Sequence, residues 1–147
     1  MIQKDGTYEL IKAYYDALST KVTIDAVVIP VYSFAPKGTT GNRIIIGTPI
    51  DTEADTVTAF TRDYSIEIDC LTEFAGGNAS YKKAFDMADA VTRLIKTSIG
   101  GNLTMSGSDH KIFHSYLELS TTLTEDTDTG TIIRRILTFR NLVQQLT

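Results

Sequence analysis

The sequence lacks the features on which several classes of protein depend. Cys70 is the single cysteine in 147 residues, so no intrachain disulfide can form and the chain is not built for an oxidising compartment. No stretch approaches the ~20 apolar residues of a membrane-spanning helix. The opening residues, "MIQKDGTYEL", lack the apolar core of a signal peptide. We therefore expect a soluble protein that is made in the cytoplasm and has no membrane partner.

A strong charge of either sign is also missing. The formal net charge is -4, and a protein that grips nucleic acid needs clustered Lys and Arg to bind phosphates. This net charge is too small to indicate a disordered chain, and 42% hydrophobic residues are ordinary for a globular protein. The length fits one domain over residues 1–147.

Two segments have the period of amphipathic helices. The first runs to about Ser19 and is capped by Asp5 or Thr7. The second begins after Asn78 or Ser80 and ends at Gly100 and Gly101, since glycine favours the left-handed position after a helix. Their expected buried residues are Leu10, Ile11, Tyr14, Tyr15 and Leu18 in the first helix, and Ala84, Phe85, Ala88, Val91, Leu94 and Ile95 in the second.

Strand patterns occupy most of the remaining sequence. "TIDAVVIPVYSF" predicts a strand interrupted or edged at Pro30, and "RIIIGTP" and "RDYSIEIDCLTEF" predict two more. Residues 33–42, 49–58 and 98–110 are expected to contain long, polar loops. A hairpin closes the chain around the turn "DTDTG", with Phe113, Ser115, Leu117, Leu119 and Thr121 on one face of its first strand. The order predicts an α+β fold: one antiparallel sheet, two amphipathic helices on one face, and a long C-terminal hairpin.

The third of these strands raises a chemical question. Glu67 and Asp69 project on one side, roughly 7 Å apart, a separation that could suit general acid–base catalysis on a sugar. Alternating acidic and apolar residues are also what a half-buried strand contains, and we favour that interpretation. Cys70 falls on the apolar face with Ile66 and Ile68, without a neighbouring base, which indicates a small core residue rather than a nucleophile.

The other candidate motifs predict no cofactor and no metal site. His110 and His114 are four positions apart on a strand, about 13 Å, which is too far to share one ion. "GNLTMSGSD" lacks the Gly-Lys-Ser/Thr ending of a phosphate-binding loop.

The densest basic cluster consists of Arg134, Arg135 and Arg140 in "TIIRRILTFR". We interpret it as a ladder of cross-strand ion pairs with Glu118 and its neighbours. A weak contact with nucleic acid or an acidic partner is the alternative. Long strands and a projecting hairpin tip, "TEDTDTGT", favour an assembling protein, because edge strands pair readily with another subunit.

The ordered combination of "SIEIDCLTEF", "YKKAFDMADAV" and "RRILTFR" resembles the tail completion, or tail terminator, proteins of long-tailed bacteriophages. In that family a strand of the type "xVxIDCWx" precedes a helix of the type "YxxAxxxADAV", and a terminal hairpin ends in "RxxxxFR". The resemblance covers nearly the whole chain in element order. One difference is Leu71, where the family often has an aromatic residue.

The resemblance implies a structural virion protein at the tail neck rather than an enzyme. Such proteins form a ring, usually a hexamer, that caps the tail tube, stops its polymerisation and joins the head connector or stopper, with DNA passing through. Six copies would carry 6 × (-4) = -24 formal charge, which disfavours adhesion of DNA. We expect acidic residues near the lumen: Glu67 and Asp69 if the sheet faces inward, or Asp126 and Asp128 if the hairpin tip does.

Other functions remain open from the residues alone. A head-completion adaptor, a stopper or a tail-tube subunit would also form a ring. A small hydrolase using Glu67 and Asp69 would need a cleft lined by both carboxylates, at least one with a raised pKa. A monomeric module that binds another protein is a third alternative.

Overall fold

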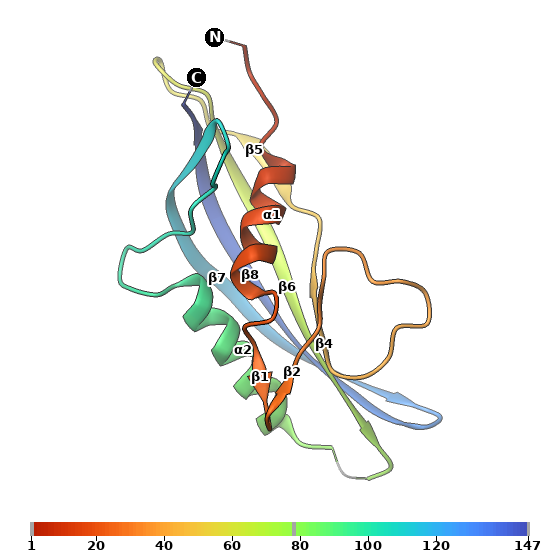
Figure 1. Cartoon of the computed structure of the whole chain (residues 1–147). Helices are drawn as coiled ribbons and strands as arrows, with labels where there is room; N and C mark the ends of the chain where they lie inside the picture. Colours follow the sequence, from red (N-terminus) through yellow and green to blue (C-terminus); the bar gives the residue numbers. More distant parts are fainter. Residues whose placement is uncertain (1, 78, 147) are drawn as a thin grey trace.

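A long twisted sheet with both helices on one face forms the body of the molecule (Figure 1). The computed structural model describes residues 2–77 and 79–146. Its elements, in chain order, are α1 (Thr7–Leu18), β1 (Thr23–Ile24), β2 (Val27–Val28), β3 (Val31–Tyr32), β4 (Arg43–Ile46), β5 (Ile50–Glu53), β6 (Thr61–Ala75), α2 (Tyr81–Ile95), β7 (His110–Thr127) and β8 (Gly130–Gln145).

The main sheet has the strand order β3-β4-β6-β8-β7, and β5 also pairs with β6. Every pair is antiparallel except β3 with β4, which are parallel. The predicted α+β fold, with its antiparallel sheet and long C-terminal hairpin, is therefore confirmed. β6 and β8 lie at the centre, paired from Thr61 opposite Gln144 to Ala75 opposite Gly130.

Side-chain alternation along β6 separates a face covered by the helices from an open face. Tyr64, Ile66, Ile68 and Cys70 are fully buried, as predicted, and burial raises the pKa of the Cys70 thiol, which keeps it protonated. Leu71 falls on the open face but is also buried. The register explains this, because Leu71 lies between two arginines, Arg43 on β4 and Arg134 on β8.

α1 begins and ends close to its predicted limits. The Asp5 carboxylate accepts the backbone N–H of Thr7 at 2.9 Å, so it caps the first turn although Gly6 is the boundary residue. Leu10, Tyr14 and Leu18 are buried as expected, whereas Tyr15 is exposed. The buried stripe passes through Ala13 instead.

α2 begins at one of its two predicted caps, but it ends earlier than predicted and one residue of its predicted buried stripe is exposed. Ser80 is the cap and accepts the backbone N–H of Lys82, while Asn78 lies outside the described residues. The helix ends at Ile95, earlier than Gly100, because Lys96 turns out of it and donates to the carbonyls of Gly101 and Ser115. The predicted burial of Phe85 is wrong: its ring stacks on Tyr81 at the surface, and Met87 is buried in the core.

The strand predicted over residues 23–34 is three short strands. Asp25 and Ala26 both have positive φ, 50° and 64°, which turns the chain back and makes β1 and β2 a tight hairpin. β3 follows Pro30 and joins the main sheet beside β4. The β-branched residues were recognised from the sequence, but a turn at Asp-Ala carries little signal because alanine seldom adopts positive φ.

A further strand occupies the segment predicted as a loop at 49–58. Ile50–Glu53 forms β5 on β6, and Ala54 and Asp55 continue to bond with Thr61. The segment is polar because it is a short edge strand whose side chains meet solvent or pair across to β6, as Asp51 does with Arg62.

Two bulges overturn the alternation predicted for β7. The register shifts between Ile112 and His114 and again between Leu117 and Leu119, which leaves Phe113 and Glu118 as extra residues. Leu117 therefore pairs with Phe139 on the helix-covered face, whereas Leu119 pairs with Thr138 on the open face. The sequence predicted one face for both.

We predict that Gly130→Ala destabilises the protein. A Cβ at this position would lie 1.9 Å from the carbonyl oxygen of Phe74, so β6 and β8 would have to separate at the hairpin tip. We expect a loss of about 1–3 kcal/mol in the free energy of unfolding, measured by chemical denaturation. Gly77→Ala is the matched control, because a Cβ there meets nothing within 4 Å. Equal stability of the two variants would contradict the close approach.

Candidate functional site

Ion pairs between neighbouring strands cover the open face of the sheet. Arg140 on β8 pairs with Asp63 on β6 and, at 3.0 Å, with Glu118 of the β7 bulge. Arg134 lies 3.5 Å from Asp69 and 3.7 Å from Glu125. At the β4 side, the Arg43 guanidinium donates to Glu73 at 2.6 Å. The ladder predicted for Arg134 and Arg140 is confirmed, with Glu118 as one of its acids.

Arg135 is not part of this ladder, so its predicted ion pairing is wrong. It points to the helix-covered face, because neighbouring residues of a strand project to opposite sides. There its guanidinium donates to the hydroxyls of Ser120 and Thr122 and lies 5.1 Å from the centre of the Phe85 ring. It thereby connects β7 to α2.

The acidic residues singled out from the sequence fall in two separate places. Glu67 and Asp69 lie on the open face, opposite Thr138 and Ile136 of β8. Asp126 and Asp128 lie at the exposed hairpin tip, where the Asp126 carboxylate accepts the Thr131 hydroxyl at 3.2 Å.

The carboxylates of the open face differ in their electrostatics. Burial raises the pKa of Asp69, with Arg134 opposing the shift, and its Oδ1 atom has no hydrogen-bond partner among the described residues. The hydrogen bond from Arg43, helped by the backbone N–H of Gly41, lowers the pKa of Glu73. Glu67 is exposed.

This geometry does not provide what the hydrolase hypothesis requires. Asp69 has the raised pKa, but five hollows that the described residues form are lined by other side chains, and neither Glu67 nor Asp69 borders any of these five. The two acids stand on a sheet surface instead of facing one another across a cleft.

The two histidines lie on opposite sides of β7. The His110 ring is buried between the Ser108 hydroxyl and the Lys4 carbonyl, at 3.3 and 3.2 Å. His114 lies on the open face and packs against Tyr116, with ring centres 5.4 Å apart. Within the described part of the chain no three potential ligands gather as a metal site.

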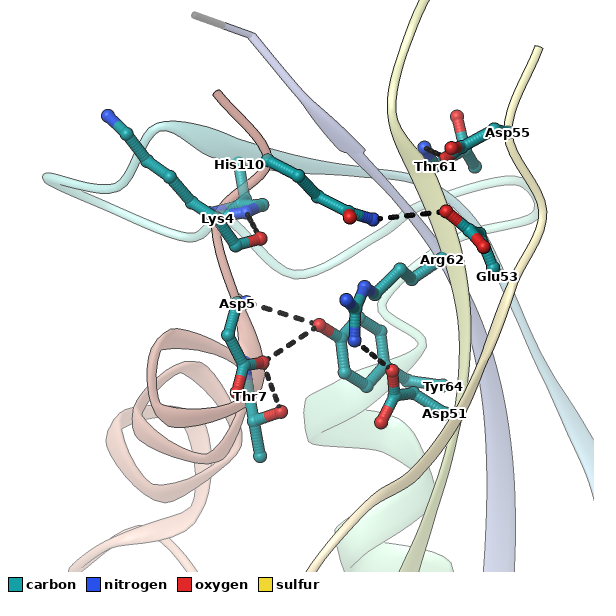
Figure 2. A network of polar contacts seen from close by, with 12 residues as sticks. Lys4, Asp5, Thr7, Asp51, Glu53, Asp55, Thr61, Arg62, Tyr64 and His110 are labelled. Atoms are coloured by element: carbon teal, nitrogen blue, oxygen red, sulfur yellow. Dashed lines mark hydrogen bonds and ion pairs between the residues drawn. The ribbon is translucent and has the colours of Figure 1, made fainter. Parts of the chain in front are cut away.

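A polar network that ties down the N-terminal segment was not foreseen from the sequence (Figure 2). The Tyr64 hydroxyl accepts the backbone N–H of Gly6 at 3.1 Å and lies 3.4 Å from the Asp5 carboxylate. Next to it, Arg62 pairs with Asp51 of β5. Gly6 and Asp5 lie 58 and 59 positions from Tyr64 in the chain, so no local spacing could have indicated these contacts.

Opposite pH effects are expected from two carboxylates of the open face. The pKa of Glu73 is depressed below its ordinary 4.5, so its stabilisation is present above that pH and is lost as the pH falls through the lower folded-state value. Glu73→Gln should cost about 1–2 kcal/mol at neutral pH, because it weakens the pair with the buried Arg43.

The pKa of Asp69 is shifted in the opposite direction, so its effect on stability has the opposite dependence on pH. Its pKa is raised above 3.8, so its contribution is favourable below that pH and is lost as the pH rises through the folded-state value. Asp69→Asn should therefore be at least as stable as the parent at neutral pH, since Arg134 keeps Glu125 as a partner. Denaturation at pH ~7 and ~4 checks both variants. A larger loss for Asp69→Asn than for Glu73→Gln would contradict these assignments.

Neither described helix is long and apolar enough to cross a membrane.

No family model matches the chain, and no curated protein does. Solved structures do match: one is a chain of a structure described as "Virion of native gene transfer agent (GTA) particle", with a TM-score of 0.70 and 20% sequence identity. The alignment covers 92% of this chain and 94% of the other, so the two share a fold over nearly their whole lengths.

Proposed function

We propose that this chain is a structural virion protein, a ring-forming tail terminator. In this role it caps the tail tube, stops its polymerisation and joins the tail to the head connector, while DNA passes through the ring. The observation that carries the proposal is the shared fold with a chain of a gene transfer agent virion over 92% of this sequence. The motif order of the sequence, which resembles the tail terminator family, supports the same role.

The open face of the sheet suits a surface that DNA passes without binding. Arg43, Arg134 and Arg140 are each held by carboxylates from neighbouring strands, so their charge is neutralised within the molecule. Glu67 adds an exposed negative charge at the middle of β6. A ring with this face inward would repel phosphates weakly and offer few free cations to hold them.

The two ends of the molecule also differ, as expected for a ring with two unlike neighbours. The β7–β8 tip projects beyond the helices, away from the end at which both termini lie (Figure 1). The tip carries Asp126 and Asp128, whereas the other end exposes Ile2 and Leu146. One axial face would then be acidic and the opposite one partly apolar.

Location within the particle tests this proposal. Labelled protein should lie at the end of the tail nearest the head, and its loss should give over-long or unjoined tails in negative-stain images. An adaptor or a stopper of the neck would instead leave tails of normal length. Label along the whole tail would indicate a tube subunit, and absence of the protein from virions would overturn the proposal.

We predict that Glu67→Lys impairs DNA passage without affecting folding. The side chain is exposed, so the change should leave thermal unfolding unaltered while each ring gains a band of cations that attract phosphates. Infectivity and DNA ejection by virions carrying the variant measure the effect. Asp16→Lys, an exposed change on α1, is the control. Fully infectious Glu67→Lys particles would show that the open face does not line the lumen.

A further inference from the structure

The two edges of the main sheet differ in length and in protection. β7 forms one edge and β3, two residues long, forms part of the other. The first half of β7 is covered, because the Ser115 carbonyl accepts the Lys96 ammonium at 2.8 Å. From Leu117 to Thr127, the backbone bonds with β8 but with no loop of the described residues.

This second half of β7 has few of the devices that block edge pairing. "LELSTTLTEDT" contains no proline and no lysine, and its one bulge lies at its start. Leu119 is 58% exposed on the open face, and Leu123 is exposed on the same side. An unpaired strand of this kind is a template for a strand from another chain.

The register shows which part of the opposite edge lies at the same level. Each residue of the sheet lies opposite a partner on the next strand. Following these partners across the sheet leads from Val31 in β3 to Thr122 in β7, and from Tyr32 to Thr121. β3 and β7 run in opposite directions, so a neighbouring copy turned about a common axis would present β3 antiparallel to β7. Contacts between two different edges at one level can close into a ring without an axial rise.

Charge and apolar exposure are complementary between these edges. Residues 26–42 contain no acid and one base, Lys37, whereas residues 116–127 contain three acids and no base, with Glu118 and Glu125 paired to arginines of β8. Phe34, 86% exposed, follows Tyr32 by two residues, and Leu119 precedes Thr121 by two. Extending β3 by two residues would therefore place Phe34 opposite Leu119.

We propose that Glu118–Thr122, within the unpaired half of β7, pairs antiparallel with residues 31–35 of the next copy. Pro30 and Pro36 bracket the second segment and limit the pairing to these five residues. The inference rests on the proposed ring and names the surface that builds it. Pairing of β7 with a second β7 is disfavoured, because it would bring two acidic segments together.

Disulfide crosslinking between two different variants tests the pairing. Tyr32→Cys and Thr121→Cys are prepared separately, each with Cys70→Ala, mixed and mildly oxidised. Residues directly opposite in antiparallel strands have Cβ atoms about 4.5–5.5 Å apart, near the range of a disulfide. The mixture should give a crosslinked dimer, and neither variant alone should. Tyr8→Cys on α1, mixed with Thr121→Cys, is the control and should not crosslink.

A second measurement uses an exposed leucine, so that folding is preserved. Leu119→Lys should weaken association at least about tenfold, because burial of a leucine is worth that much in affinity. Thermal unfolding should stay unchanged. Val57→Lys, in the β5–β6 loop, is the matched control and should associate normally.

The outcomes separate this inference from the proposed function. Rings seen by native mass measurement or negative stain, without the Tyr32–Thr121 crosslink and with Leu119→Lys still assembling, would overturn the edge pairing and leave the ring intact. Self-crosslinking of Thr121→Cys would show β7–β7 pairing and overturn it as well. A chain that remains monomeric even with tail tubes would overturn both proposals.

Discussion

The pairing of β6 with β8 is the constraint on which the rest of the structure depends. Fifteen residues of each strand are in unbroken register, from Thr61 opposite Gln144 to Ala75 opposite Gly130. This register decides which side chains face the helices and which form ion pairs on the open face. It also carries β4 and β5 on one side and β7 on the other, so the position of both edges follows from it.

The strands with clear alternation could be predicted from the sequence. In β6, Ile66, Ile68 and Cys70 are buried on the helix side as the period of two requires, and the burial of side chains alternates along the second half of β8 as well. The errors arise where tertiary contacts or backbone conformation outweigh local pattern. Asp25 and Ala26 adopt positive φ, and Lys96 leaves α2 for two carbonyls that lie outside the helix.

The candidate site was predictable only in part for the same reason. That Glu67 and Asp69 share a face follows from their spacing, and the pairing of Arg140 with Glu118 follows from the hairpin. Burial decides which carboxylate has a raised pKa. Asp69 is partly buried and Glu67 is exposed although they are only two residues apart, and the sequence does not indicate this difference in burial. The network around Tyr64 joins distant segments and leaves no local trace.

The two bulges of β7 have a consequence for how this strand tolerates changes of length. Before the first bulge, the even-numbered residue Ile112 faces the helices. Between the two bulges the odd-numbered residues, such as Ser115, face them, and after the second bulge the even-numbered residues do so again from Ser120 onward. The second bulge thus restores the phase that the first one shifts. Removing one bulged residue would invert the side chains beyond it, whereas removing both Phe113 and Glu118 would preserve the phase of the tip. Length changes in β7 are therefore tolerable in pairs.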